Sequence, residues 1–335
     1  MIPLSILDLA PVSSGYSIAD SFAASKALAQ HAEQLGYHRY WLAEHHNMPG
    51  IASAATSLLI SHLAAATSTL RLGAGGIMLP NHSPLVIAEQ FGTLATLYPG
   101  RIELGLGRAP GSDHTTAQAL RRHSPNSDLQ FPADVQELQR YFANATAGQD
   151  VLAVPGQGLH VPLWILGSSL FGARLAAQLG LPYAFASHFS PALMTQASAL
   201  YRQEFRPSAQ LDKPYLMLAL NVYAADSTAE AQLLFTSAQQ QFVNLVRGQA
   251  SQLPPPVASM DDIWLPHEKA YVNQALACSV VGDAATVKQG IEDFVGRHQP
   301  DELMLTCMMH DPGACQHSYR IVAGLQNKTA NPVLS

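Results

Sequence analysis

The stretch LRLGAGGIMLPNHSPLVIAEQFGTLATLYPGRIELGLGRAPGSD, residues 70–113, decides the fold because it holds two consecutive strand–turn–helix units. Residues 70–79 form an apolar run that is typical of a buried strand, and residues 85–97 carry the apolar spacing of a helix. Residues 101–107 predict a second short strand, which runs into the turn 108–113. Both turns combine flexible backbone with polar side chains, so we expect them to receive a cofactor.

Glycines lie inside both of these strands. A glycine weakens a strand and often marks a place where another group approaches the backbone closely. Gly73, Gly75, Gly76 and Gly105 therefore imply that something flat or bulky lies against this part of the sheet. We interpret that group as a flavin.

Composition excludes several classes of protein. With 335 residues, 48% of them hydrophobic, the chain can bury a large core and fits one large α/β domain. Its net charge is −6 with only 18 lysines and arginines, and no basic run occurs. Nucleic acid or an anionic membrane surface is therefore not expected as its main partner.

Three features indicate the compartment. The N-terminus lacks a cationic segment before its apolar stretch and carries Asp8 within that stretch, unlike a signal peptide. No window approaches the roughly 20 apolar residues of a membrane span. Cys278, Cys307 and Cys315 show no Cys-x-x-Cys spacing, which fits a reduced compartment and no metal site. We expect a cytoplasmic protein.

Strands and helices alternate along the whole chain. The expected strands cover residues 4–10, 37–43, 70–79, 101–107, 162–166, 183–186, 215–223 and 302–308. The expected helices cover residues 18–35, 53–66, 85–97, 132–145, 167–178, 228–246, 284–297 and 312–325. Eight strands and eight helices in this alternation predict a (β/α)₈ TIM barrel. The alternative is an open doubly wound sheet, but no Gly-x-Gly-x-x-Gly follows the first strand.

We therefore predict a single domain over residues 1–335, with one insertion after the fourth strand and another after the seventh. The first insertion covers about residues 109–161 and the second about residues 225–300. Within the second, residues 253–266 are too rich in proline for a long helix. They are either a cover over the mouth of the barrel or a plain connector.

The active end of such a barrel is the one at which its strands end. Polar side chains follow the expected strands there: His45, His82, Arg108, Ser168, Ser169, His188 and His310. Adjacent histidines such as His45 and His46 are also commonly one buried and one exposed imidazole with no catalytic task.

Two of these features predict a phosphate site together. Arg108 offers a guanidinium fork, although a single arginine after a strand is otherwise a surface charge. Gly167, Ser168 and Ser169 precede a helix, so hydroxyls and backbone N–H groups lie at the positive end of its dipole. An ordinary N-cap is the alternative for the serines. Because both features follow neighbouring strands, phosphate binding is the favoured interpretation.

Several motifs resemble those of the bacterial luciferase-like monooxygenase family, whose members are flavin-dependent (β/α)₈ barrels. They are WLAEHH at 41–46, LGAGGIMLP at 72–80, PGRIELGLGR at 99–108, AAQLGLP at 176–182 and VGD at 281–283. The resemblance covers nearly the whole chain and is specific to the family rather than to a substrate. It is closer to the single-chain members than to the light-emitting enzymes.

The resemblance implies roles for individual residues. His45 matches the catalytic histidine of the family, which handles protons near the flavin. Arg108, Ser168 and Ser169 match its phosphate contacts, in the turn that begins at Gly167.

The resemblance also implies how the flavin ring is held. Gly75 and Gly76 match a non-proline cis peptide beneath the isoalloxazine ring, and Met78 and Asn81 are expected to line the ring pocket. Two positions depart from the light-emitting enzymes. Gly107 stands where they have a reactive cysteine, and Gly172 where they have a phosphate-contacting threonine, so light emission is not implied.

The activity implied by the resemblance is that of an FMN-dependent monooxygenase. Reduced FMN, supplied by a separate flavin reductase, and O₂ would oxygenate a small organic substrate such as an aldehyde. The family also contains enzymes that use the deazaflavin F420 and flavin-binding proteins with little catalysis. Both cofactors present the same ring and first phosphate, so these alternatives remain open.

A metal-dependent hydrolase is a more remote alternative. The histidines His45, His82, His188 and His310 could gather a divalent ion at the rim of the barrel. Against this interpretation, the first strand lacks a His-x-His motif, and the chain shows no paired-carboxylate motif.

Two expected helices indicate self-association. Residues 51–66 and 85–97 are too apolar for full exposure, and relatives in the family pair through this side of the barrel. We expect a homodimer.

Overall fold

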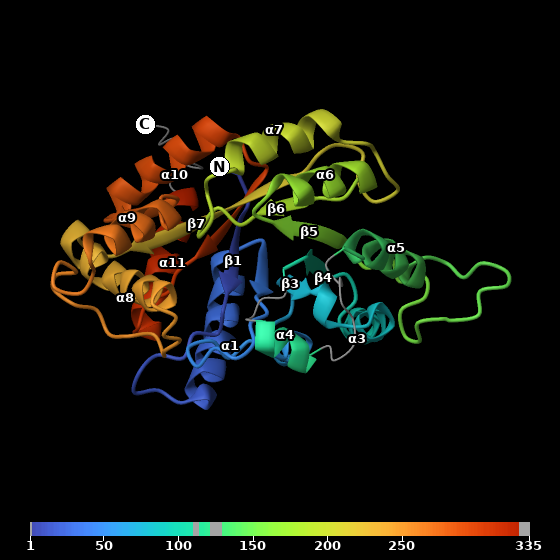
Figure 1. The fold of residues 1–335 in the computed structure, drawn as a ribbon, viewed down its shortest axis with the longest axis horizontal. Helices are drawn as coiled ribbons and strands as arrows, with labels where there is room; N and C mark the ends of the chain where they lie inside the picture. Colours follow the sequence, from blue (N-terminus) through green and yellow to red (C-terminus); the bar gives the residue numbers. More distant parts are fainter. Residues whose placement is uncertain (1, 110–113, 121–128, 328–335) are drawn as a thin grey trace, which may run out of the picture.

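The computed structural model describes residues 2–109, 114–120 and 129–327 (Figure 1). Within these ranges the strands are β1 (Leu4–Asp8), β2 (Arg39–Leu42), β3 (Arg71–Met78), β4 (Ile102–Gly107), β5 (Leu163–Gly167), β6 (Tyr183–Phe185), β7 (Leu216–Ala224), β8 (Ser279–Gly282) and β9 (Glu302–Thr306). The helices are α1 (Ile18–Leu35), α2 (Thr56–Ala65), α3 (Pro84–Leu97), α4 (His114–Leu120), α5 (Phe131–Phe142), α6 (Leu170–Leu179), α7 (Met194–Glu204), α8 (Thr228–Val246), α9 (Pro266–Ala275), α10 (Ala284–His298) and α11 (Pro312–Asn327), with the short 3₁₀ turn η1 (Leu79–Asn81).

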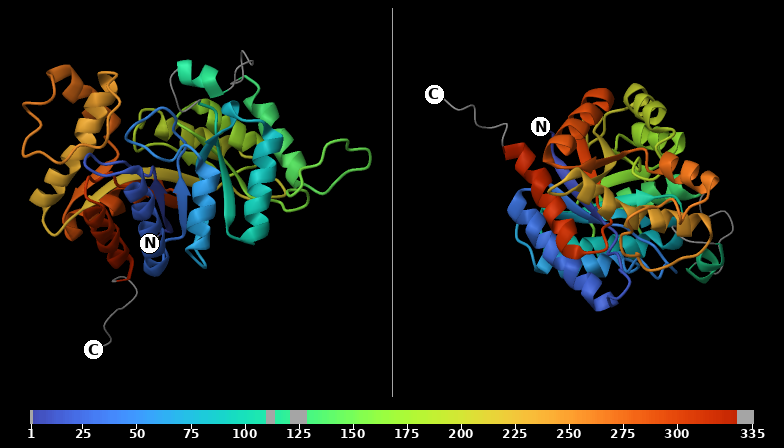
Figure 2. Two further views of the ribbon diagram at one scale, coloured as in Figure 1. Left: turned by 90° about the horizontal axis from the view of Figure 1, so that it is seen from below. Right: turned by 90° about the vertical axis from the view of Figure 1, so that its left-hand side faces the viewer.

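Eight of the strands close into a parallel barrel. The order around it is β1, β2, β3, β4, β5, β6, β7 and β9, and β9 pairs again with β1. Helices surround this sheet on the outside (Figure 2). The closed sheet confirms the predicted (β/α)₈ barrel and excludes the open doubly wound alternative.

The strand β8 was not expected from the sequence. Asn221 of β7 pairs with both β8 and β9, so these strands lie on opposite edges of β7. β6 also lies opposite β9, along the first residues of β7. β8 therefore extends the edge at which β6 ends, as an extra strand outside the eightfold repeat. The helices α4, α7 and α9 were likewise not among the expected ranges.

Capping interactions at both ends of α1 explain why its bounds were predicted correctly. The Ser17 side chain accepts a hydrogen bond from the Asp20 N–H, and the Asp20 carboxylate accepts one from the Ser17 N–H. This reciprocal capping box fixes the start of the helix. Gly36 ends it in the left-handed conformation, at a φ of 78°. Gly180 ends α6 in the same way, at a φ of 63°.

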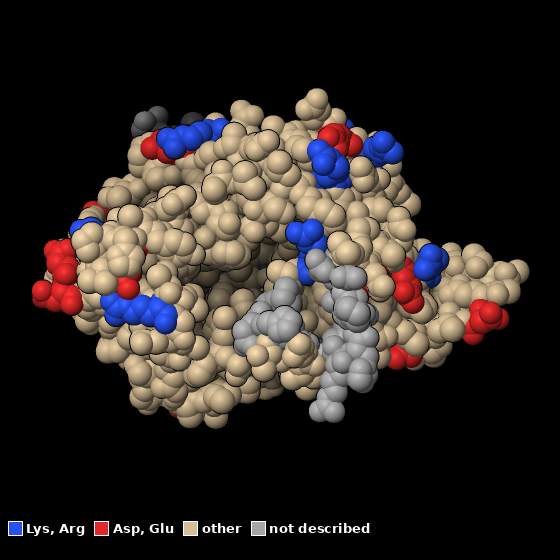
Figure 3. Space-filling view, in the orientation of Figure 1, with Lys and Arg blue, Asp and Glu red and all other residues tan. Residues whose placement is uncertain are grey.

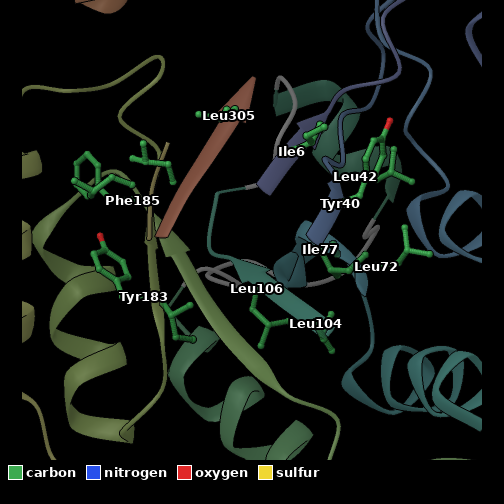
Figure 4. Packing of buried hydrophobic residues seen from close by; sticks show 14 of the residues in the cluster. Ile6, Tyr40, Leu42, Leu72, Ile77, Leu104, Leu106, Tyr183, Phe185 and Leu305 are labelled. Atoms are coloured by element: carbon green, nitrogen blue, oxygen red, sulfur yellow. The ribbon is translucent and has the colours of Figure 1, made fainter. Parts of the chain in front are cut away.

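The core has two layers, set by the alternation of side chains along each strand. One set points outward and packs beneath the helices, and Figure 4 shows ten of its members from several strands: Ile6, Tyr40, Leu42, Leu72, Ile77, Leu104, Leu106, Tyr183, Phe185 and Leu305. The other set fills the lumen: Leu7, Trp41, Ala43, Trp164, Met217, Ala219 and Met304. The lumen is therefore packed with side chains rather than open.

A buried charge network closes the end of the barrel at which the strands begin. Arg39 donates to both Glu302 oxygens, at 2.8 and 2.9 Å, and also to Glu103. Its guanidinium lies 4.8 Å from the ring centre of Trp164. The Tyr215 hydroxyl donates to Glu302 as well, at 2.8 Å. Because each charge is paired, the network satisfies groups that would otherwise be costly to bury.

The segment between α8 and α9 is fastened to the opposite end of the barrel. The Leu253 N–H donates to the Val12 carbonyl, and the Ser14 N–H donates to the Leu253 carbonyl, both at 2.9 Å. Leu253 itself is fully buried. Further along, Met260 and Trp264 pack with α8 and α9 in a small separate core. The segment is thus anchored at the rim, and its role as a cover over the mouth stays a prediction.

Among the described residues, no helix is both long and apolar enough to span a membrane.

Candidate active site

The residues predicted for the site gather at one end of the barrel, on strands that are neighbours in the sheet. They lie as follows: His45 after β2, Gly75 and Gly76 within β3, Met78 at its end, Asn81 in η1, Arg108 directly after β4, Gly167 at the end of β5, and Ser168 and Ser169 before α6. Figure 3 shows a hollow near the centre of this face, with few charged side chains around it. Residues 110–113 of the turn after β4 lie outside the described residues.

The peptide bond between Gly75 and Gly76 is cis, as the resemblance implied. The register between β3 and β4 shifts at this point, between Ala74 and Ile77. Next to it, the Met78 side chain lies over Gly107, where an added Cβ would be 2.7 Å from the Met78 sulfur. Gly107 therefore leaves room for the methionine side chain at the end of β3.

The strand glycines face other atoms of the protein itself, whereas contact of a flavin with Gly75 and Gly76 stays a prediction. An added Cβ would meet the protein's own atoms at 2.7 Å for Gly73, 2.8 Å for Gly75, 2.7 Å for Gly76 and 2.2 Å for Gly105. The contacts include the Trp41 side chain and backbone carbonyls of adjacent strands. These positions are glycine because the barrel itself packs tightly there.

Arg108 lies beside the N-terminus of α6. Its guanidinium carbon is 4.2 Å from the ring centre of Phe171, which belongs to the first turn of that helix. Ser169 is the N-cap of α6, yet its side chain makes no capping hydrogen bond. The first N–H groups of the helix and the serine hydroxyls are therefore available to an anion next to a fixed cation. This donor set fits a phosphate monoester such as that of FMN.

Glu44 connects the ends of β2 and β3. Its carboxylate hydrogen-bonds the Nε2 atoms of His46 and His82, at 2.9 and 2.8 Å, and accepts the Met78 N–H at 3.1 Å. The side chain is 1% exposed. Burial raises the pKa of Glu44, but the hydrogen bonds from His82, His46 and Met78, with the charge of His82, outweigh it and lower the pKa below its usual value. No role for Glu44 was predicted from the sequence.

His188 lies near the expected catalytic His45. It follows β6, and its ring packs edge-on against Phe189 at 4.8 Å between ring centres. Its backbone carbonyl accepts a hydrogen bond from the Asn221 amide at 2.6 Å. Burial, with a smaller effect of the positive charge of His45, lowers the pKa of His188 to about 3. His188 is therefore neutral at physiological pH.

The four rim histidines do not form one metal site. His82 hydrogen-bonds Glu44, whereas the Nε2 of His310 is 2.9 Å from the Ser14 carbonyl oxygen in the loop after β1. Among the described residues, the only cluster of three possible metal ligands is Glu44, His46 and His82. The arrangement on which the hydrolase alternative depended is absent from this part of the chain.

A family model described as luciferase-like monooxygenase matches residues 2–298. The chain belongs to this family. The luciferase-like monooxygenase of Escherichia coli (strain K12) is 56% identical over 327 residues, which are 98% of each chain. The N-acetyl-S-alkylcysteine monooxygenase of Bacillus subtilis (strain 168) is 35% identical over 238 residues, covering 69% of this chain and 70% of the relative.

Solved structures agree with this assignment. Apo-MsnO8 matches with a TM-score of 0.88 and 32% identity, covering 98% of this chain and 99% of the other. The oxygenating constituent of 3,6-diketocamphane monooxygenase, in complex with FMN, shares the fold at a TM-score of 0.71 and 16% identity, with 96% of each chain covered. An F420-dependent secondary alcohol dehydrogenase shares the fold at a TM-score of 0.69 and 14% identity, with 97% of this chain and 98% of the other covered. This member of the family is an oxidoreductase.

Proposed function

We propose that the enzyme is an FMN-dependent monooxygenase that uses O₂ and reduced flavin from a separate flavin reductase to oxygenate a small organic substrate such as an aldehyde. The observation that carries the proposal is the position of Arg108 beside the uncapped N-terminus of α6. A guanidinium and free helix N–H groups at adjacent strand ends form a phosphate site. The monooxygenase relatives support the reaction class.

The residues of the chain have separate tasks in this proposal. Arg108, Ser168 and Ser169 bind the flavin phosphate at the turn that begins with Gly167. Gly75, Gly76, Met78 and Asn81, on β3 and in the turn after it, would hold the flavin ring. Bound reduced flavin supplies the electrons that activate O₂.

His45 holds or moves a proton next to the ring, because an imidazole has one ring nitrogen that can accept a proton and one that can donate it. The neutral His188 beside it adds no second positive charge to the site. The apolar lumen below, with Leu7 and Trp41, excludes water from the base of the site.

A separate reductase is part of the proposal because the resemblance to the luciferase-like family implies it. Coenzyme F420 is the second candidate cofactor. The F420-dependent dehydrogenase shares the fold, and the phosphate site described above suits the first phosphate of either cofactor. A flavin-binding protein with little catalysis is the third possibility.

The experiment is an anaerobic titration of the untagged enzyme with reduced FMN, oxidised FMN and F420, followed by rapid mixing with O₂. We expect reduced FMN to bind most tightly, and His45→Ala to change the rate of flavin reoxidation and the yield of H₂O₂. His267→Ala, an exposed histidine on α9, is the matched control and should leave both unchanged. Preference for F420, or no binding of reduced flavin, would refute the proposal.

The proposal extends to assembly and location. The enzyme is a homodimer that pairs through α2 and α3, where Leu58 and Leu97 are 71% and 60% exposed. It works in the cytoplasm, a location that its three free cysteines favour.

A further inference from the structure

Three possible metal ligands converge next to Met78 of the proposed flavin site. Glu44 and His46 follow β2, and His82 follows η1 at the end of β3. One donor atom from each lies within 4.8 Å of the other two. The two Nε2 atoms are already 2.8 and 2.9 Å from the same carboxylate oxygen of Glu44. Two elements far apart in the sequence therefore present three donors to one point.

This donor set is chemically suited to a transition metal. Two imidazoles and a carboxylate are the three protein ligands of many zinc sites. Because Zn–N distances are about 2.0–2.1 Å, the donor atoms of such a site must lie within a few ångströms of one another. The Glu44 side chain is only 1% exposed, and the side chains of His46 and His82 are 14% and 27% exposed. A buried carboxylate with two half-buried imidazoles is a rigid set of ligands rather than a loose surface cluster.

The cluster also adjoins a cavity with room for a further ligand. Glu44 and His82 line a cavity of about 290 Å³ between α2 and α3. Its wall carries Ser57 and Gln90, whose side chains hydrogen-bond each other at 2.8 Å. A cavity of this size with polar groups holds water readily. Water can therefore complete the coordination, and the cavity gives an ion a path to the ligands.

We propose that Glu44, His46 and His82 bind one divalent transition-metal ion of the Zn²⁺ class, with water from the adjacent cavity as the fourth ligand. The ion takes the place of the hydrogen bonds that now join the loop after β2 to the turn after β3. Metal binding at this site does not depend on the flavin reaction, and its test contains no flavin.

The test is calorimetric titration of the untagged, chelator-treated enzyme with Zn²⁺, and with Co²⁺ read by its visible absorption. We expect one ion per chain and a Co²⁺ spectrum typical of a site with nitrogen and oxygen ligands. His46→Gln and His82→Gln each keep an amide that can hydrogen-bond Glu44 but remove a metal donor. Since outer ligands alone change metal affinity by about 10–100-fold, each variant should lose at least tenfold.

The control is His62→Gln on α2, which removes an exposed imidazole outside the cluster and should bind as the wild type does. Circular dichroism verifies that each variant is folded, and Glu44→Gln provides a third variant if one of the histidine variants is not. If no ion binds stoichiometrically, the cluster is a hydrogen-bond network only and the proposal is wrong. Binding that persists in both cluster variants, or that His62→Gln abolishes, shows adventitious surface binding and overturns it equally.

Discussion

At the scale of single residues, Arg108 makes the most specific contribution to the proposed phosphate site. Arg108→Ala removes the guanidinium that stacks on Phe171. Charge-assisted hydrogen bonds contribute about 1.5–3 kcal/mol, so FMN affinity should fall roughly tenfold to 100-fold. Riboflavin has the same ring but no phosphate, so its affinity should not change. Fluorescence titration with both flavins measures the difference.

The matched control for Arg108→Ala is Arg174→Ala on α6, the helix that carries Phe171. Arg174 pairs with Glu204 at 3.2 Å on an exposed part of the surface, where an ion pair contributes little to stability. The Arg174→Ala variant should bind both flavins as the wild type does. Equal loss of FMN and riboflavin binding in Arg108→Ala would place the arginine against the ring instead of the phosphate.

His188 predicts a pH dependence of stability. Its pKa in the folded state is about 3, below the value of about 6.5 for a free histidine. Between these values the unfolded chain binds a proton that the folded chain does not, so stability falls as the pH falls. From pH 6.5 to pH 5 the free energy of unfolding should drop by about 2 kcal/mol more in the wild type than in His188→Gln. Urea unfolding at the two pH values measures this, and identical pH slopes would show that His188 titrates normally.

Much of the proposed site was accessible from the sequence because it follows from strand ends. His45, Arg108 and Ser169 each lie in the turn after a strand, and parallel strands bring such positions to one face. The role of Glu44 was not accessible. Its partner His82 is 38 residues away, and only the pairing of β2 with β3 brings them together. The buried Arg39 network could have been predicted, because charged residues stand near the start of otherwise apolar strands.

At the scale of elements, a substitution at Gly105 tests whether close packing between β3 and β4 requires glycine. In Gly105→Ala the new methyl group would lie 2.2 Å from the Ala74 carbonyl oxygen, so the strands must shift. Overpacking of this kind costs about 1–3 kcal/mol. Gly296→Ala is the control, since no atom lies within 4 Å of the added group in α10. It should stabilise by about 0.5–1 kcal/mol, because alanine favours a helix over glycine.

Urea unfolding of the two glycine variants measures both changes. Opposite signs would confirm that Gly105 is required by strand packing. A neutral Gly105→Ala would instead mean that the sheet accommodates a side chain there, and the close approach of the backbones would not be the reason for the glycine.

The accuracy of the predicted elements follows the strength of their local signals. The bounds of α1 and α8 were predicted correctly, because each begins at a serine cap, Ser17 or Ser227, and carries a long apolar pattern. The strand β8 has four residues and pairs only with the end of β7, so neither length nor alternation marks it. The glycines were correctly placed within the strands, but the protein atoms packed against them could not be predicted, because the sequence does not reveal which atoms oppose a strand.

At the scale of the whole molecule, the two ends of the barrel have different tasks. The Arg39 network with Glu103 and Glu302 fills the end at which the strands begin. The opposite end carries His45, Arg108 and the other proposed site residues. Removal of one partner from a buried ion network costs about 3–5 kcal/mol, so substitutions in this network should be strongly destabilising. The residues proposed for the reaction lie at the other end, outside this network.

The proposed homodimer can be tested at its expected interface. Leu58 of α2 is 71% exposed, and α2 packs beside α3. A stable dimer buries about 1,600 Å² in total and excludes charge from its centre, so Leu58→Glu should shift the enzyme to monomer. Leu233→Glu makes the same change at an exposed leucine on α8 and should leave the dimer intact. Sedimentation equilibrium at micromolar concentration measures both. A monomeric wild type would refute the dimer, and equal dissociation in the two variants would place the interface elsewhere.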